Sequence, residues 1–173
     1  MIREILLYDE PILRQKAKKV KRVDASIERL VDDMIETMRA ANGVGLAAPQ
    51  VGVPLRVVVI EVPDQDVIVL VNPEVVKASG ERLIEEGCLS VPGYVGEIKR
   101  HVTVVVKARD LRGKEIRVKG TALLAQALEH ETEHLDGVLF FDHLESMDQL
   151  RRIETRKEAE ETEEAEVEVT PAQ

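Results

Sequence analysis

The most informative segment of this chain is Leu128-Glu129-His130-Glu131-Thr132-Glu133-His134-Leu135-Asp136-Gly137. It contains the pattern His-Glu-x-x-His, in which the two histidines are four residues apart. On an α-helix such residues share one face, so His130 and His134 can bind the same metal ion. Glu131 lies about 100° round the helix from His130, beside the ion, where a general base is needed. The segment therefore predicts a metal-binding helix.

The residues around this pattern support a half-buried helix rather than an exposed one. Thr121 is suited to cap its start, and Gly137 is suited to end it. Leu124, Leu128 and Leu135 make the flanks of the helix apolar. The alternative is a pair of surface histidines one turn apart, since Glu and His are common on exposed helices. The apolar flanks and the adjacent glutamate favour metal binding.

The single cysteine, Cys88, lies in the glycine-flanked segment Glu86-Gly87-Cys88-Leu89-Ser90. Two imidazoles and a thiolate would leave a fourth position open, as in catalytic metal sites, and they suit Fe(II), Zn(II), Co(II) or Ni(II). Cys88 could instead be a small buried residue or a nucleophile with a histidine as its base. The nucleophile hypothesis leaves the spacing of the two histidines unexplained. These residues together predict a metal-dependent hydrolase.

The segment Gly43-Val44-Gly45-Leu46-Ala47-Ala48-Pro49-Gln50 is too rich in small residues for an ordinary helix or strand. It could be a phosphate-binding loop, but it lacks the Lys-Ser/Thr ending of a P-loop. It could also be a plain helix-to-strand turn. Its one specific hydrogen-bond donor is the side-chain amide of Gln50, which beside a metal-bound carbonyl would stabilise a tetrahedral oxyanion.

The rest of the chain predicts an α+β fold, in which antiparallel or mixed strands pack around the central metal-binding helix. Apolar residues recur at helical spacing from Ile27 to Met38, after an N-cap at Asp24 or Ser26 and before the end at Asn42-Gly43. The predicted strands are 56–62 and 67–71, with a hairpin of 102–108 and 114–119 around Asp110-Leu111-Arg112-Gly113.

Composition predicts one catalytic domain at residues 1–150 and an acidic C-terminal helix end or tail, partly disordered, at 151–173. Residues 158–168 include seven glutamates. The net charge of −9 argues against a nucleic-acid surface, and there is no apolar run that could span a membrane. One free thiol and no secretion signal predict a cytoplasmic protein. No exposed apolar segment demands a dimer, so we expect a monomer.

Three segments, 43–50, 86–90 and 130–134, closely resemble the three signature motifs of peptide deformylases, in the order and spacing of that family. The likeness extends from about Tyr8 to Phe141. It implies a peptide-deformylase-like fold and an enzyme that removes the formyl group from the N-terminal methionine of N-formylmethionyl peptides, with release of formate. A ribosome near its exit tunnel is a further partner that such a substrate suggests.

The resemblance also implies roles for individual residues. The metal ligands would be Cys88, His130 and His134, with one divalent ion, Fe(II) in this family, that Zn, Ni or Co can replace. Glu131 would be the acid/base, Gln50 and the backbone N–H of Leu89 would bind the oxyanion, and Gly45 would allow close approach of the substrate. The pocket for the methionine side chain would be lined by Val44, Ile84, Leu123 and Ala127. Glu86 and Arg100 would pair to brace the cysteine loop.

The chain departs from the family pattern near the histidines. Glu129 stands where Gln is usual, and Glu133 stands where Asp is usual. Glu129 adds a negative charge near the metal-bearing turn of the helix, where we expect it to raise the pKa of the bound water. We expect Gln126 to place a polar group near the methionine pocket. Two other interpretations stay open: another His-Glu-x-x-His hydrolase, with His143 as a downstream ligand, and a non-catalytic homologue that binds nascent chains or ribosomes.

Overall fold

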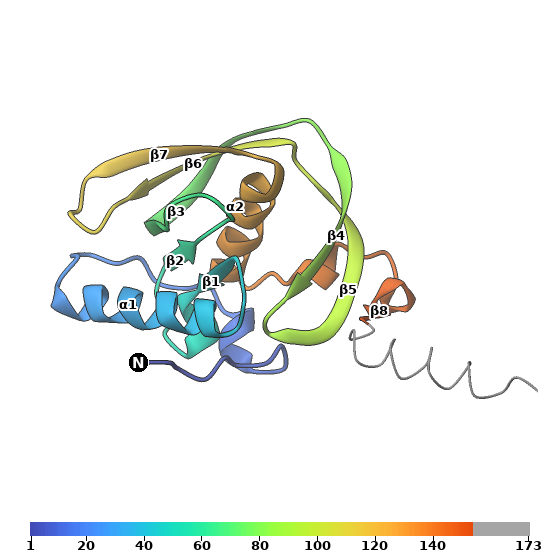
Figure 1. The fold of residues 1–173 in the computed structure, drawn as a ribbon, viewed down its shortest axis with the longest axis horizontal. Helices are drawn as coiled ribbons and strands as arrows, with labels where there is room; N and C mark the ends of the chain where they lie inside the picture. The colour runs from blue at the N-terminus through green and yellow to red at the C-terminus, as the bar shows by residue number, and fades with distance from the viewer. Residues whose placement is uncertain (154–173) are drawn as a thin grey trace, which may run out of the picture.

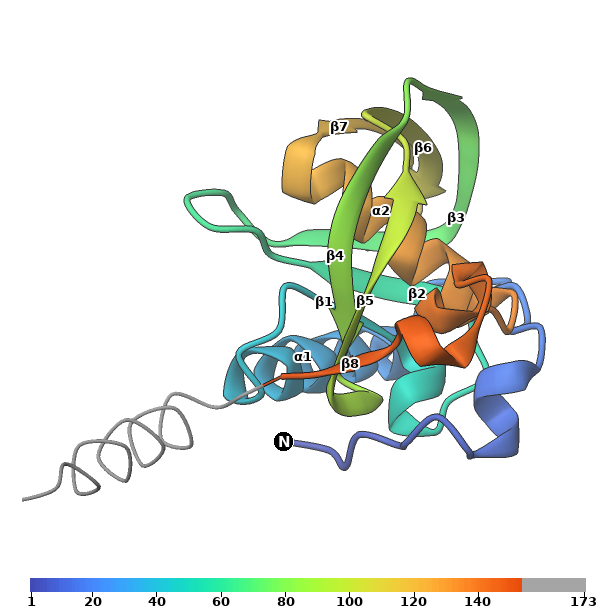
Figure 2. The ribbon, with the colours of Figure 1, turned by 90° about the vertical axis from the view of Figure 1, so that its right-hand side faces the viewer.

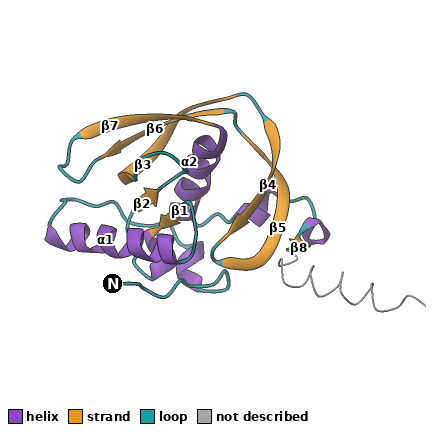
Figure 3. Ribbon diagram, in the orientation of Figure 1, coloured by secondary structure: helices purple, strands orange, loops and turns teal. Residues whose placement is uncertain are grey.

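The computed structural model describes residues 1–153 (Figure 1). The described chain contains more strand than helix, with two α-helices and several short 3-10 helices (Figure 3). The α-helices and strands are α1 (Ala25–Ala40), β1 (Gly45–Ala47), β2 (Val57–Ile60), β3 (Ile68–Ser79), β4 (Arg82–Cys88), β5 (Val91–Arg100), β6 (Thr103–Arg109), β7 (Glu115–Thr121), α2 (Ala122–Leu135) and β8 (Arg151–Arg152). The 3-10 helices are η1 (Pro11–Arg14), η2 (Ala48–Val51), η3 (Phe140–His143) and η4 (Met147–Gln149).

The strands form two antiparallel sheets with α2 between them. One sheet has the order β1-β2-β3-β6-β7 and the other has the order β4-β5-β8. Both views show α2 enclosed by these strands, whereas α1 lies on the other side of β1 and β2 (Figures 1 and 2). The chain passes from the first sheet to the second where β3 is followed by β4. This arrangement confirms the α+β fold predicted from the sequence, with a central helix surrounded by strands.

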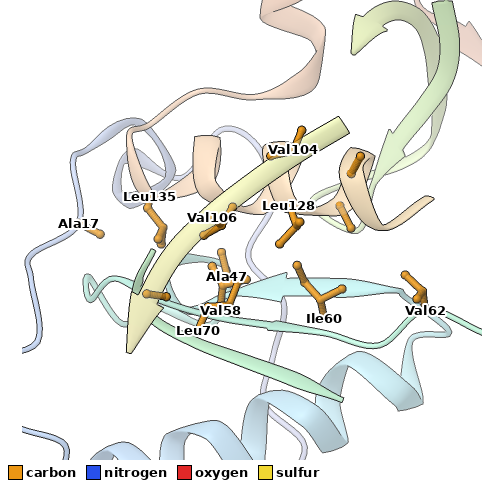
Figure 4. Packing of buried hydrophobic residues seen from close by; sticks show 13 residues of the cluster. Ala17, Ala47, Val58, Ile60, Val62, Leu70, Val104, Val106, Leu128 and Leu135 are labelled. Carbon is orange, nitrogen blue, oxygen red and sulfur yellow. The ribbon is translucent and has the colours of Figure 1, made fainter. Parts of the chain in front are cut away.

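The strand β2 holds the two helices in place because both of its faces are buried. Alternate side chains of a strand point to opposite faces. Val57 and Val59 belong to the hydrophobic cluster that contains α1, whereas Val58 and Ile60 belong to the cluster that contains α2. Figure 4 shows Val58, Ile60 and Leu128 pointing toward one another between β2 and α2. The helix that carries the histidines is therefore fixed against a rigid sheet.

Several local features predicted from the sequence are confirmed. The helix α1 begins after Asp24, whose carboxylate accepts hydrogen bonds from the backbone N–H groups of Ser26 and Ile27. The hairpin β6–β7 turns at Asp110, whose side chain accepts from the backbone of Arg112 and Lys114. Thr121 is the N-cap of α2, but its side chain makes no capping hydrogen bond. The strand β7 ends at Thr121, and α2 begins at Ala122, which has a positive φ of 52°.

Two parts of the second sheet were not predicted. The hairpin β4–β5 pairs Arg82–Cys88 with Val91–Arg100, and its apolar side chains pack with Phe140. The short strand β8 pairs with Tyr94 and Val95 of β5, so the second sheet extends past the predicted domain end at residue 150. The predicted acidic tail falls mainly on residues 154–173, which lie outside the described residues. Among residues 1–153, neither helix is long and apolar enough to cross a membrane.

Candidate active site

The structure brings together the three predicted metal ligands from two elements. His130 and His134 lie one turn apart on α2, and Cys88 is the last residue of β4. The Nε2 atoms of the two histidines are 3.1 Å apart, and the Cys88 Sγ lies 3.3 Å from Nε2 of His134. All three ligand atoms lie within 4.8 Å of one another. Ligands that bind one ion at about 2.0–2.3 Å are separated by similar distances.

The chemistry of these donors fits a metal ion. The Nδ1 atom of His130 is hydrogen-bonded to Glu86 Oε2 at 3.0 Å, which orients the ring so that Nε2 faces the cluster. The ring of His130 also stacks against Phe140. Burial holds the pKa of His134 well below its usual range, which keeps that ring neutral and able to donate an electron pair.

A buried ion pair supports His130 from behind. Arg100 donates from Nε and Nη2 to the two carboxylate oxygens of Glu86, at 3.0 and 2.5 Å, and both side chains are almost fully buried. Burial alone would raise the pKa of Glu86, but hydrogen bonds from His130 and Arg100 lower it to about 2. The expected pairing of Glu86 with Arg100 is confirmed, and Glu86 is a permanent acceptor for His130.

Glu131 lies beside the cluster with one oxygen unpaired. Its Oε1 is 3.9 Å from Nε2 of His130, and its Oε2 is buried without a hydrogen-bond partner. Burial raises the pKa of this carboxyl to about 7. A buried carboxylate that has no hydrogen-bond partner and a pKa close to neutral pH is suited to accept and return a proton.

Gly45 makes room for Glu131. A Cβ built on Gly45 would lie 2.6 Å from Glu131 Oε1 and 2.9 Å from its Cγ. The missing side chain of Gly45 thus leaves space for the Glu131 carboxylate, in addition to any space that it leaves for substrate. We expect Gly45→Ala to displace Glu131 and to lower kcat/KM about 100-fold, as a 1 Å misplacement can, while the protein stays folded.

Gly43→Ala is the matched control for Gly45→Ala. Both variants are compared with the unaltered protein by formate release and by thermal unfolding. Its Cβ would also make a close contact, at 2.7 Å, but with the end of the flexible Leu89 side chain. That side chain can rotate away, so we expect a much smaller loss. Equal losses in the two variants would contradict the role given to Gly45.

Gln50 is held rigidly beside the cysteine. Its side chain is buried in η2, where Oε1 accepts from the backbone N–H of Ala47 at 2.9 Å. Its Nε2 donates to Ser90 Oγ at 3.0 Å and lies 3.6 Å from Cys88 Sγ. The amide is thus held in place by Ala47 and Ser90, and its second N–H, which faces Cys88 Sγ, is the one that can donate to charge that develops beside it.

A cavity of about 310 Å³ opens onto Glu131 and the ligand cluster. Three of the four predicted pocket residues, Val44, Leu123 and Ala127, line it, together with Leu89 and Gln126. Ile84 is not part of its lining. It lies four residues before Cys88 on β4, opposite Ile98, and packs against the apolar cluster of the β4–β5 hairpin. The sequence-based placement of Ile84 is therefore not supported.

The cavity wall also includes residues of β5 and of the segment after β8 that the sequence did not predict, among them Tyr94 and Ile153. Tyr94 belongs to β5, and Ile153 donates its backbone N–H to Gly93 directly after β8. No sequence signal could place them there, because neither β5 nor β8 was predicted.

The two unusual glutamates of α2 face away from this cavity. The carboxylate of Glu129 accepts from the backbone N–H of His101 and lies 2.9 Å from its Nδ1. Glu129 is therefore held by His101 and does not line the cavity, and its effect on the acidity of a bound water stays a prediction. Glu133 accepts from Arg100 and is hydrogen-bonded to His143. His143 is thus engaged elsewhere and is not one of the clustered ligand residues.

Comparisons with known proteins agree with this geometry. The sequence profile described as "Polypeptide deformylase" matches residues 2–150. The chain belongs to the polypeptide deformylase family. A peptide deformylase of Dehalococcoides mccartyi is 60% identical over 153 residues, which cover 88% of this chain and 92% of the relative. One of Thermomicrobium roseum is 47% identical over 172 residues, which cover 95% of this chain and 97% of the relative.

Solved structures give the same result. The crystal structure of a peptide deformylase from Legionella pneumophila superimposes with a TM-score of 0.83 at 42% identity, covering 99% of this chain and 100% of that one. The peptide deformylase of Thermotoga maritima gives a TM-score of 0.81 at 35% identity, covering 84% and 99%. The chain is therefore a hydrolase that removes the N-formyl group from newly made polypeptides, and peptide deformylases are metalloenzymes.

Proposed function

We propose that Cys88, His130 and His134 hold one divalent metal ion, Fe(II), which Zn(II), Ni(II) or Co(II) can replace. The observation that carries this proposal is the convergence of three electron-pair donors within 4.8 Å, with His130 oriented by Glu86. A metal ion bound there would polarise the formyl carbonyl and make water more acidic. The thiolate and the two imidazoles favour a borderline-soft ion over magnesium or calcium.

The side chains around the cluster carry out the proton transfers. Glu131 takes a proton from the attacking water at Oε2, the oxygen that has no other partner. It then gives this proton to the amine nitrogen as the C–N bond of the formamide breaks. The amide of Gln50 and the backbone N–H of Leu89 donate to the oxygen that becomes negative. Formate and a free N-terminal amine leave the site.

The cavity provides the specificity for formylmethionine. Val44, Leu123 and Ala127 form an apolar wall for the methionine side chain. At about 310 Å³ the cavity is at the lower end of the range for ligand pockets, about 300–1,000 Å³. A site of this size takes one side chain and its adjoining amide, and the rest of the peptide extends outside it.

We also propose that the enzyme works as a monomer in the cytoplasm and meets its substrates beside the ribosome. All residues assigned to the site belong to one chain, so a second copy is not needed to complete it. The proposed role of Cys88 requires a thiolate, which a reducing compartment preserves. Its substrates carry the formyl group from the start of synthesis.

Formate release tests the proposed function. The protein is purified without oxygen, loaded with Fe(II) and incubated with formyl-Met-Ala-Ser. We expect formate in proportion to bound metal, loss of release after chelation, and recovery when metal is restored. Acetyl-Met-Ala-Ser is the control substrate, and release of acetate should be far slower. Cleavage between Met and Ala would instead indicate a peptidase, and a metal-loaded protein that releases no formate would favour a non-catalytic binding role.

A further inference from the structure

A chain of polar contacts runs from the surface of the protein to one of the proposed metal ligands. His143 Nε2 lies 2.9 Å from both carboxylate oxygens of Glu133. Glu133 Oε1 accepts from Arg100 Nη1 at 2.8 Å. Arg100 holds Glu86 through its other two nitrogens, and Glu86 accepts from Nδ1 of His130. Five side chains from four elements thus form one continuous series.

Arg100 is the centre of this series, and its position depends on both carboxylates. Its side chain is 1% exposed, so the guanidinium cannot exchange a protein partner for water. Nε and Nη2 are occupied by Glu86, which leaves Nη1 for Glu133. Because the guanidinium is planar and rigid, fixing Nη1 also fixes the edge that binds Glu86. Glu133 therefore determines the orientation of the acceptor that orients His130.

Glu133 itself needs a second support. Its side chain is 24% exposed and has more rotational freedom than the aspartate expected at this position. His143 supplies the support from η3, the turn that follows α2. That turn is anchored on both sides, since Phe140 is buried and Asp142 accepts from Arg14. His143 thus approaches Glu133 from a fixed segment of the chain.

We propose that His143 is a positioning residue for the metal centre, acting through Glu133, Arg100 and Glu86 on His130. The inference rests on the proposed metal site. Neither His143 nor Glu133 lines the cavity, so the pair has no contact with substrate. Its effect is on how tightly the ion is held and on the geometry of the ligand set.

Substitutions at His143 test this proposal on the Co(II)-loaded protein. The readouts are the visible absorption spectrum, which reports ligand geometry, and the rate of Co(II) loss to a chelator. We expect His143→Ala to release Co(II) about 10-fold faster, the lower end of the effect of removing an outer partner, with a shifted spectrum and an unchanged KM. His143→Gln should restore both readouts, because its amide nitrogen can reach the place of Nε2. His143→Asn should not, because its arm is shorter.

His101→Ala is the matched control. His101, which lies between β5 and β6, forms the same kind of contact with Glu129 of α2, but this contact does not lead to a metal ligand. We expect it to leave Co(II) release and the spectrum unchanged. In a protein that already carries Glu133→Asp, we expect His143→Ala to cause no further change in the rate of Co(II) loss or in the spectrum. The reason is that the shorter carboxylate cannot reach both Arg100 and His143.

The proposal is overturned if His143→Ala leaves Co(II) release unchanged, or if His101→Ala accelerates it equally. It is also overturned if the only change is a lower melting temperature of both metal-free and metal-loaded protein, since that indicates a merely structural role. If the unaltered protein binds no Co(II), the metal site of the proposed function itself is wrong, and this result is separate from any difference among the variants.

Discussion

Replacing Glu131 by glutamine is expected to lower kcat by about 10³-fold without loss of metal. General acid–base catalysis contributes about 10²–10⁴-fold. Glutamine keeps the size of the side chain and its place against Gly45, but it cannot take a proton from water. Glu131 is not one of the three clustered ligand residues, so metal content should stay the same. Single-turnover formate release and metal analysis of the same sample measure the two effects together.

Glu129→Gln is the control for this substitution. It removes the same charge from the same helix, two residues away, where the carboxylate binds His101 instead of facing the cavity. We expect formate release to change by less than about threefold, because Glu129 lines no part of the cavity and contacts none of the three ligand residues through its carboxylate. A Glu131→Gln variant that keeps a tenth of its activity, or a Glu129→Gln variant that loses as much, would exclude Glu131 as the acid/base.

The metal cluster could be predicted from sequence because its geometry is mostly local. The helix fixes the relation of His130 to His134, whatever the rest of the chain does. Cys88 was placed with them by the preceding glycine, by its residue type and by the likeness to a known family. Gln50 was found in the same way, as the only specific donor of its segment.

The strands β4 and β5 were missed for a physical reason that concerns the site itself. Prediction of strands depends on alternating apolar and polar residues, and here the buried positions include Glu86 and Arg100. These charges are buried because they pair with each other and with groups on α2. The pattern that would have revealed the strands is thus broken by the residues that orient His130. Such failures are expected where a functional site overrides local preference.

Contacts between distant segments were the other part of the site that could not be predicted from the sequence. Gly45 was expected to face the substrate, but only the packed structure shows that Glu131 occupies the space beside it. Ile84 was assigned to the cavity wall, but the pairing of β4 with β5 places it against the hairpin's own apolar cluster. Neither relation has a signature in the residues next to it, because each depends on how two elements pack.

Cys88→Ala is expected to abolish activity through loss of the metal. The variant retains His130 and His134, but two imidazoles alone leave the ion with one protein ligand fewer than catalytic sites usually have. Loss of a residue that only hydrogen-bonds to a metal ligand lowers metal affinity by about 10–100-fold. Because Cys88 is proposed as a ligand itself, we expect its loss to lower metal affinity by more than about 100-fold. Equilibrium dialysis against Co(II) or Zn(II), with formate release from the same samples, measures both consequences.

The metal content of this variant also separates the chemical roles that the sequence left open for Cys88. If the thiol were a nucleophile, its removal would stop formate release while the histidines kept their ion. If the site were a peptidase of the His-Glu-x-x-His type, metal would be retained as well. Cys88→Ser gives a finer test, because a hydroxyl keeps the volume but is a poor ligand for a borderline-soft ion. Joint loss of metal and activity in both variants is the result that a thiolate ligand requires.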